Sequence, residues 1–282
     1  MSLVTLEQIL KQAKAGRYGI GAFNVANMEM VMGAIEAAEE LNSPIILQVA
    51  EGRLRYSPLP LIGPVMVAAA KAAKVPVAVH YDHGFDLALI KQALELGFSS
   101  VMFDGSHGPL DQNIETTRKV MTLAAEFGAS VEAEIGKVGG SEGDYAGVEI
   151  MITSVEDAKR FYAETQVHAL AVAIGTAHGE YKVEPNLRFD RLQEIHDQVA
   201  VPLVLHGGSG LLAGDFRRAI THGVSKVNIA TASFQSIVKR MYAIFSDNQG
   251  VTYFQLHDAI RQATYENVKE HICIFGSNNQ CK

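Results

Sequence analysis

The sequence has little cysteine, little charge and no long apolar run, and each shortage excludes a class of protein. Only two of its 282 residues are cysteines, Cys273 and Cys281, which is too few for a disulfide framework and fits a reducing compartment. No apolar run approaches membrane-spanning length, and no basic region with a following apolar stretch opens the chain, so we expect a soluble, cytoplasmic protein without a membrane partner. Lysine and arginine (24) are fewer than aspartate and glutamate (31), and this formal net charge of −7 gives no electrostatic reason to bind nucleic acid.

What the sequence does have is enough apolar material for one large core. Hydrophobic residues make up 48% of the chain and charged residues 20%, which favours a packed globular protein over a disordered one. No proline- or serine-rich linker and no shift in composition divides the chain. Its length is close to the roughly 250 residues of a typical (β/α)8 barrel. We therefore expect one domain over residues 1–282.

Short apolar segments alternate with helical patterns along the chain. Eight of these segments are predicted strands: 18–25, 44–50, 75–84, 99–104, 130–136, 169–175, 201–206 and 225–230. Two further helices, at about 232–246 and 253–270, close the chain. The alternation predicts an α/β protein, a (β/α)8 TIM barrel with C-terminal helices. A doubly wound sheet is the alternative, but it places chemistry only at its switch point, whereas polar groups here end nearly all predicted strands.

Histidines stand at the ends of three predicted strands. His83 follows the third strand, His178 follows the sixth and His206 ends the seventh. Because the carboxyl ends of barrel strands meet at one mouth, the three imidazoles can converge on one ion, in the pattern of a catalytic Zn²⁺ site. Taken singly, each would more often be a structural or loop histidine. We expect His80 to lie deeper, in a supporting or core role, and His107 is a substitute ligand.

A glycine-rich turn at 207–210 follows the seventh strand, and Asn228 and Thr231 lie around the end of the eighth. Loops after strands seven and eight commonly hold a phosphate with backbone N–H groups and a helix N-terminus. A glycine-rich turn alone is weak evidence, because turns favour glycine generally. Its position in the expected barrel is what predicts a phosphate site.

Three carboxylates are available for proton transfer near these groups. They are Asp82, Glu134 and Glu142, the last in a glycine-rich loop over 137–147 that is typical of a lid or binding loop. A metal, a phosphate site and carboxylates together suit polarising a ketone on a phosphorylated substrate and moving protons beside it. Deacetylation and phosphoester hydrolysis remain open from these parts alone.

Seven segments, in matching order over nearly the whole chain, resemble the class II, metal-dependent fructose- and tagatose-bisphosphate aldolases. The segments are 22–25, 82–84, 131–136, 138–142, 173–179, 205–210 and 226–231. The resemblance implies an enzyme of carbohydrate metabolism that reversibly cleaves a ketose phosphate to dihydroxyacetone phosphate and an aldehyde. It also implies one catalytic Zn²⁺ per chain, a monovalent cation (Na⁺ or K⁺), and assembly as a homodimer or homotetramer.

The same resemblance implies roles for individual residues. The implied zinc ligands are His83, His178 and His206, with Glu134 as a carboxylate that can contact a displaced ion. Asp82 is similar to the residue that serves the aldehyde oxygen, and Glu142 to the loop acid–base that exchanges a proton on the dihydroxyacetone-phosphate carbon. The implied substrate-binding residues are Asn24, Gly179, Lys182, Gly207, Gly208, Ser209, Asn228 and Thr231.

The chain departs from the fructose-type members at the aldehyde end. Ala50 stands where a serine is usual and His257 where an arginine is usual, and both usual residues hold the distal phosphate. Ala232 replaces an acidic residue that usually follows the tagatose-type pattern. Arg53, Arg55 and Arg261 could compensate, or they could be ordinary surface charges.

The part of the implied substrate site that binds dihydroxyacetone phosphate therefore resembles the family, and the part that recognises the aldehyde does not. We expect weak activity on fructose 1,6-bisphosphate and a preference for a ketose 1-phosphate whose far end is neutral or carries a carboxylate. Tagatose 1,6-bisphosphate stays open. The alternatives are a related barrel acting on a non-phosphorylated or acidic aldehyde, a catalytically inactive barrel that binds phosphorylated sugars, and a metal-dependent hydrolase.

Overall fold

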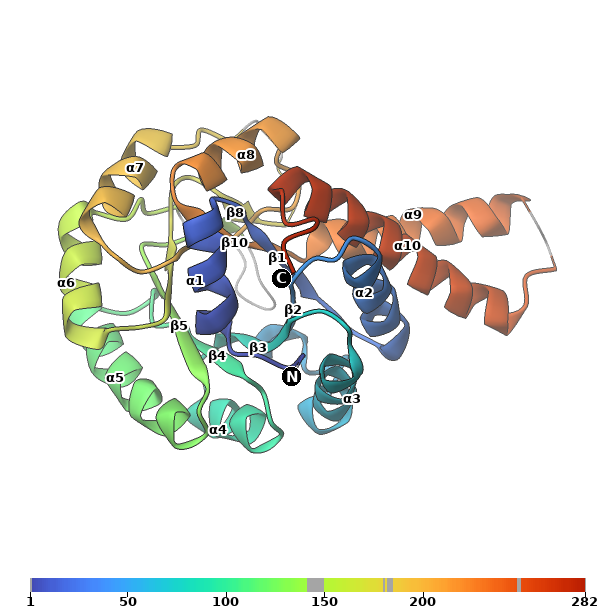
Figure 1. Ribbon diagram of the computed structural model, residues 1–282, viewed down its shortest axis with the longest axis horizontal. Coiled ribbons are helices and arrows are strands. Elements are labelled where there is room, and N and C mark those ends of the chain that lie inside the picture. The colour runs from blue at the N-terminus through green and yellow to red at the C-terminus, as the bar shows by residue number, and fades with distance from the viewer. Residues whose placement is uncertain (1, 141–149, 180, 182–184, 248–249, 282) are drawn as a thin grey trace.

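Eight parallel strands close into a barrel that a ring of helices surrounds (Figure 1). The structure is a computed structural model, and it describes residues 2–140, 150–179, 181, 185–247 and 250–281. The strand order is β1-β10-β9-β7-β5-β4-β3-β2, and β1 pairs with both β2 and β10, so the barrel has no free edge. The predicted (β/α)8 fold is confirmed.

All eight predicted strands are present, some shorter than expected. The barrel strands are β1 (Ile20–Asn24), β2 (Ile45–Ala50), β3 (Val77–Gly84), β4 (Ser100–Phe103), β5 (Ser130–Ile135), β7 (Ala169–Val172), β9 (Leu203–Leu205) and β10 (Val224–Ile229). The helices are α1 (Leu6–Gly16), α2 (Met28–Glu40), α3 (Leu59–Ala72), α4 (Leu87–Glu95), α5 (Leu110–Glu126), α6 (Val155–Thr165), α7 (Phe189–Gln198), α8 (Ala213–Thr221), α9 (Thr231–Asp247) and α10 (Tyr253–Phe275). Two short strands outside the barrel, β6 (Gly139–Gly140) and β8 (Ala177–His178), pair with each other and were not expected.

Side chains alternate between the two faces of each barrel strand. On β2, Ile45, Leu47 and Val49 face outward and join the apolar core beneath the helices. Ile46 belongs instead to a second core inside the barrel, so Gln48, two residues further along, also points inward. The inward face of a strand therefore changes from apolar to polar toward its carboxyl end.

Helix α1 closes the end of the barrel that faces the viewer in Figure 1. Its buried residues Leu6, Leu10 and Ala13 pack against the inward side chains at the strand beginnings, such as Ile46 and Val204. Thr5 and Gln8 cap the helix reciprocally. With one end closed by apolar packing, the polar side chains lie in the middle of the barrel and at the opposite end, which we call the mouth.

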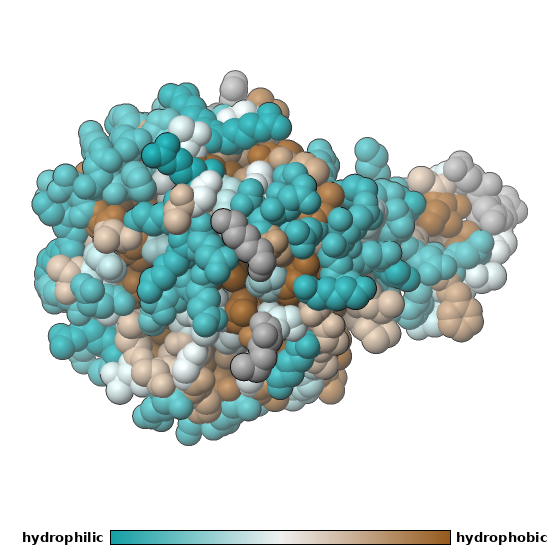
Figure 2. All heavy atoms as spheres, viewed as in Figure 1, coloured by the Kyte–Doolittle hydropathy of each residue, from teal (hydrophilic) through white to brown (hydrophobic). Residues whose placement is uncertain are grey.

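Helices α9 and α10 form a hairpin that extends beyond the barrel (Figure 1). The burial of α10 begins at Ala259, and from there the helix packs closely on α2, where Gly33 leaves room for the backbone of Arg261. The projecting part carries hydrophobic surface on the face shown in Figure 2. Tyr253 and Phe254, at the start of α10, are 68% and 75% exposed. None of the described helices combines the length and the apolar character needed to cross a membrane.

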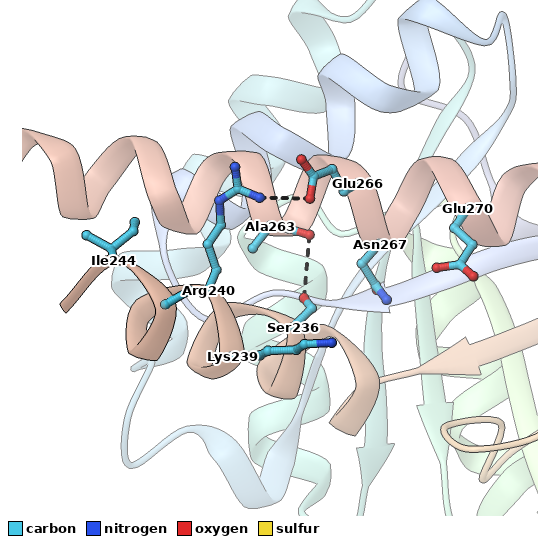
Figure 3. Close-up of a pocket in the computed structure, with 9 residues that line it drawn as sticks. Ser236, Lys239, Arg240, Ile244, Ala263, Glu266, Asn267 and Glu270 are labelled. Carbon is cyan, nitrogen blue, oxygen red and sulfur yellow. Dashed lines mark hydrogen bonds and ion pairs between the residues drawn. The ribbon is translucent and has the colours of Figure 1, made fainter. Parts of the chain in front are cut away.

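A groove of about 660 Å³ runs between the two helices of the hairpin (Figure 3). Arg240 reaches across it to Glu266 at 2.8 Å, and the hydroxyl of Ser236 donates to the carbonyl of Ala263 at 3.4 Å. The groove is lined by side chains of α9 and α10 alone, so it is separate from the strand ends where the polar groups converge.

Candidate metal centre

The structure brings His83, His178 and His206 together at the mouth. They come from the ends of β3 and β8 and from the residue after β9. One ring nitrogen of each lies within 4.8 Å of the others, and the ring centroids are 4.6–6.1 Å apart. Three imidazole nitrogens gathered around one point could hold a divalent cation.

The backbone of His83 is held in an unusual conformation. Its φ of 46° lies in the left-handed region, which residues other than glycine rarely adopt, and the β3–β4 register shifts between Tyr81 and Gly84. Such a conformation persists only where the surrounding structure enforces it, and it is common at functional sites. Here it turns the histidine at the end of the strand, next to Asp82.

Asp104 orients the His83 ring. Its Oδ2 lies 2.8 Å from Nδ1 of His83, and its Oδ1 accepts hydrogen bonds from the backbone and hydroxyl of Ser106. Burial alone would raise the pKa of Asp104, but the hydrogen bonds with His83 and Ser106 hold it well below its usual range. An ionised Asp104 therefore keeps the proton on Nδ1 and leaves the lone pair of Nε2 for another partner. Asp104 is not among the site residues expected from the sequence.

His206 lies between two carboxylates on β5. Its Nε2 is 2.8 Å from Oε1 of Glu132, and its Nδ1 is 3.0 Å from Oε2 of Glu134. Burial lowers the pKa of His206, but the carboxylates of Glu132 and Glu134 outweigh it and raise the pKa to about 9. This part of the site therefore favours a positive charge beside the two glutamates.

His178 has the opposite tendency. Burial and the neighbouring rings of His83 and His206 lower its pKa to about 3, so it is a neutral imidazole at neutral pH. It is placed by the pairing of β8 with β6, in which Gly140 lies opposite His178. Glu142, two residues after Gly140 in the sequence, lies outside the described residues.

The donor set fits a divalent metal ion. Among the described residues, Nδ1 of His206 and Oε2 of Glu134 are buried and make no aligned hydrogen bond, although they are 3.0 Å apart. Buried polar atoms normally have partners, and a cation would satisfy both. A second group, formed by His83, Asp104 and Glu134, could also hold an ion, and it shares His83 with the three-histidine group.

Asp82 is held by three side-chain amides. Its Oδ1 accepts from Nδ2 of Asn228 at 3.1 Å, and its Oδ2 accepts from Gln48 at 3.0 Å and Asn24 at 3.4 Å. Burial would raise the pKa of Asp82, but the electrostatic effect of His83 and Lys226 outweighs it and lowers the pKa below its usual value. The result is an ionised, oriented carboxylate beside the histidine cluster.

The residues expected at the phosphate site also converge. Gly207 has φ of 69°, and a Cβ there would lie 2.6 Å from the carbonyl oxygen of Ala177, so only glycine fits against β8. The hydroxyl of Ser209 accepts from the backbone N–H groups of Ala230 and Ala232, at 3.3 and 3.1 Å. This joins the glycine turn to the N-terminus of α9, which begins at Thr231.

The other expected phosphate residues are only partly described. A Cβ on Gly208 would lie 2.8 Å from the backbone oxygen of Asn228, so this glycine allows the turn to pack against β10. Gly179 adopts φ of 88° and has open space where a Cβ would lie. Lys182 lies outside the described residues.

The four candidates for the distal end of the substrate lie in different settings. His257 is 2.5 Å from Glu29, and Arg261 is 2.7 Å from Glu36, so acidic residues of α2 hold both. Arg55 is exposed and stacks on Tyr56 at 4.7 Å.

Arg53 is the distal candidate that best fits an anion site. It lies just after β2, and its guanidinium is 6.0 Å from the ring of Phe234 in the first turn of α9. Its Nε is buried without a hydrogen-bond partner among the described residues. Ala50 pairs with Asp82 across β2 and β3, so the methyl group stands beside the proposed reaction centre.

Two further histidines of the sequence analysis are not members of the three-histidine group. His80 is fully buried, with Nδ1 2.8 Å from the hydroxyl of Ser100, which agrees with a supporting role. His107 is exposed and packs near Phe85.

The supporting residues Gln48, Glu132 and Lys226 are also not among the expected site residues. Their only signal is spacing, because each lies two residues from an inward side chain on its own strand.

Comparisons with known proteins agree with this geometry. A sequence model of the family described as "Fructose-bisphosphate aldolase class-II" matches residues 4–280. The chain is 40% identical to a sulfofructosephosphate aldolase of Alkalicoccus urumqiensis, covering 100% of this chain and 99% of the relative. It is 37% identical to a fructose-bisphosphate aldolase of Staphylococcus aureus, with 100% of both chains covered. The crystal structure of the YdjI aldolase from Escherichia coli K12 superposes with a TM-score of 0.89 at 34% identity, covering 99% of this chain and 100% of that one.

Proposed function

The chain belongs to the class II fructose-bisphosphate aldolase family and is a carbon–carbon lyase, and we propose that it reversibly cleaves a ketose 1-phosphate. The products would be dihydroxyacetone phosphate and an aldehyde. The observation that carries this proposal is the convergence of His83, His178 and His206 beside the ionised Asp82. Members of this family act on phosphorylated sugars, and the glycine turn at the start of α9 supports the same substrate class.

We propose Zn²⁺ as the metal, because a set of three imidazole nitrogens suits zinc. His83 would bind through Nε2, His206 through Nδ1 and His178 through one of its ring nitrogens. A bound cation would polarise the carbonyl group of the substrate. Glu134, 3.0 Å from His206, could contact the ion in a displaced position.

The proton transfers are assigned to two carboxylates. Asp82 would accept the proton of the substrate hydroxyl at C4, since its three amide partners hold the carboxylate in place and its pKa is lowered in the resting site. Glu142 would exchange the proton on the dihydroxyacetone-phosphate carbon. Support for Glu142 comes from the chain itself, because it follows by two residues the Gly140 that pairs with His178.

The phosphate of the dihydroxyacetone half would lie against the glycine turn. Gly207, Gly208 and Ser209 would line it together with the N-terminus of α9 at Thr231, where free N–H groups favour an anion. Asn228 bonds to Asp82 in the resting structure and would also face this half of the substrate. Gly179 and Lys182, with a monovalent cation, would complete the site.

Metal dependence tests the proposal directly. The protein should bind about one Zn²⁺ per chain, as the three-histidine site implies. Dihydroxyacetone phosphate release should stop after chelation and return when zinc is added. His206→Ala should lose metal and activity together, whereas His107→Ala should retain both, because His107 is exposed and outside the cluster. A His206→Ala protein with full metal content and activity would refute the ligand assignment, and release of inorganic phosphate would indicate a hydrolase instead.

We propose that the far end of the substrate carries a single negative charge, as in a carboxylate or a sulfonate. Ala50 supplies no hydroxyl, and Glu29 holds His257, which leaves Arg53 as the cation with an unpartnered buried nitrogen. One guanidinium balances one charge better than the two of a phosphate. The 40% identical relative is named for a substrate with a sulfo group, which supports this choice.

A substrate panel decides the distal group. We expect kcat/KM for 6-deoxy-6-sulfofructose 1-phosphate to exceed that for fructose 1,6-bisphosphate by at least about tenfold. Arg53→Ala should lower the preferred value by about 10²-fold, because a charged partner at an interface is worth roughly 2–5 kcal/mol. Arg261→Ala is the control, since Glu36 already pairs with that arginine.

Other outcomes of the panel are equally informative. If the protein prefers tagatose 1,6-bisphosphate and Arg53→Ala abolishes that preference, Arg53 does bind the distal group, but that group is a phosphate. A preference for fructose 1,6-bisphosphate that survives Arg53→Ala would refute the distal assignment.

We also propose a cytoplasmic homodimer or homotetramer. The described cysteines, Cys273 and Cys281, are both free, in line with a reducing compartment. The projecting hairpin offers an apolar surface for a second copy of the chain.

A further inference from the structure

A lysine is buried in the middle of the barrel, directly below the site. Lys226 on β10 is fully buried, and it is the only lysine or arginine buried among the described residues. An ammonium group is rarely placed in such a position unless it is paired. Its Nζ lies 2.9 Å from Oε2 and 3.1 Å from Oε1 of Glu132, and 2.7 Å from Oδ1 of Asn228.

One series of these contacts, which we call the His206 arm, connects Lys226 through Glu132 to the histidine cluster. Oε1 of Glu132 accepts a hydrogen bond from Lys226 and lies 2.8 Å from Nε2 of His206. Because Glu132 contacts the Nε2 side of the ring, the Nδ1 side of His206 faces the cluster and Glu134.

The other series of contacts, the Asp82 arm, connects Lys226 through Asn228 to Asp82. The carbonyl oxygen of the Asn228 side chain accepts from Lys226, so its NH₂ group must point to the other side. There it donates to Oδ1 of Asp82 at 3.1 Å. Lysine has three donors and no acceptor, which means that it can only bind the oxygen end of this amide. It thereby fixes which end of Asn228 meets the carboxylate.

We propose that Lys226 is a positioning residue that sets two parts of the reaction site at once. Through Glu132 it holds His206 in the orientation that presents Nδ1 to a metal ion, and through Asn228 it holds the Asp82 carboxylate. This inference rests on the proposed roles of His206 and Asp82. It adds that a single buried cation fixes their relative position.

Stability alone is a poor explanation for this lysine. A buried ion pair recovers little more than the cost of removing its charges from water, and well-packed apolar residues often serve a fold equally well. The inward residues nearer α1, such as Ile46 and Val204, show that the same barrel is filled with apolar side chains where no site lies above them.

Three variants separate the two arms. Glu132→Gln should weaken the affinity of the resting protein for Zn²⁺ by about 10- to 100-fold, the usual effect of losing a partner of a metal ligand, and should change the absorption spectrum of bound Co²⁺. Asn228→Ala should leave the metal affinity within about threefold of wild type and lower kcat for carbon–carbon cleavage by about 10²-fold. Lys226→Met, similar in length but uncharged, should show both effects.

Coupling between the sites gives a second readout. At saturating metal, Lys226→Met should slow cleavage more than it slows proton exchange on dihydroxyacetone phosphate, because Asp82 is the carboxylate it holds. At saturating metal, the double variant Lys226→Met with Asn228→Ala should cleave the substrate about as slowly as Lys226→Met alone, since both changes break the Asp82 arm.

A purely structural role predicts a different result. Leu192→Ala, in the outer helix α7, is the control, because Leu192 is fully buried and outside the polar network. It should lower the melting temperature without changing metal affinity, the Co²⁺ spectrum or the ratio of cleavage to exchange. A folded Lys226→Met protein with wild-type metal affinity and kcat would overturn the proposal, and so would losses that merely follow the melting temperature as in Leu192→Ala. Metal affinity and the Co²⁺ spectrum need no substrate, so they test the His206 arm even if the proposed reaction is wrong.

Discussion

Asp82 and Glu142 have different proposed roles in proton transfer. Asp82 accepts hydrogen bonds from three amide groups in a buried site, which keeps it ionised and fixed. We expect Asp82→Asn to slow carbon–carbon cleavage by about 10²–10⁴-fold, the usual value of a general acid–base group, because an amide cannot take up the hydroxyl proton. Proton exchange on dihydroxyacetone phosphate should be affected much less. Cleavage kinetics and solvent isotope exchange, measured on the same preparation, check both values.

Glu142→Gln should show the reverse pattern, with slow exchange and a smaller effect on cleavage. Asp111→Asn is the control for removing a carboxylate, since Asp111 is exposed and pairs with Arg160 at the surface. Equal, small losses in both assays for both variants would remove the proposed division of roles.

Residues at strand ends could be predicted from the sequence, but their partners could not. The three histidines could be predicted because each follows an apolar strand, and the strands of a barrel end at one mouth, where the histidines converge. They are His83, His178 and His206. Asp104 supports His83 from the adjacent strand β4, and Glu132 supports His206 from β5, two strands away from β9, so these partners depend on the strand order and register of the barrel. The ion pairs that hold His257 and Arg261 depend on how α10 packs on α2, and no local pattern reveals that packing.

At the scale of elements, the barrel strands were predictable because they are buried along their whole length. Each reads as a short apolar run between turns, and only its bounds shift by a few residues. Strands β6 and β8 contain two residues each, too few to show any periodicity. Their effect is nevertheless large, because their pairing places His178 in the cluster.

Gly140 tests the role of that pairing. It adopts φ of 84°, and a Cβ there would lie 2.2 Å from the backbone oxygen of His178. Gly140→Ala should therefore displace β8 and weaken zinc binding by about tenfold or more, since shifts of about 1 Å at a reaction site can cost 10²-fold. Titration with a competing chelator measures this affinity.

Gly128 provides the matched control. It also has a positive φ, 66°, but no atom lies within 4 Å of a Cβ placed there. Gly128→Ala should carry only the backbone strain, roughly 1 kcal/mol of stability, and keep the metal affinity of the wild type. If the two variants bind zinc equally well, β6 does not position His178.

At the scale of the whole molecule, the hairpin is the feature that a single barrel does not need. Its outer surface repeats apolar residues at helical spacing: Val238, Tyr242 and Phe245 lie on one face of α9 and are 52%, 72% and 56% exposed. Tyr253 and Phe254 extend the apolar surface onto α10. Contiguous exposed aromatic residues of this kind usually mark a protein interface, and closed association of identical chains is the commonest form.

We therefore expect the chain to self-associate through the hairpin. The mass in solution, measured by light scattering after size exclusion, should be a multiple of the 30.5 kDa chain. Tyr242→Glu combined with Phe245→Glu should reduce that mass, because burying two new carboxylates in an apolar contact costs several kcal/mol. Phe127→Glu, at the end of α5 and 41% exposed, places the same charge on an aromatic position away from the hairpin and should leave the mass unchanged. A wild-type protein that runs at 30.5 kDa, or a double variant that keeps the full assembly, would show that the aromatic surface serves something other than a second copy of the chain.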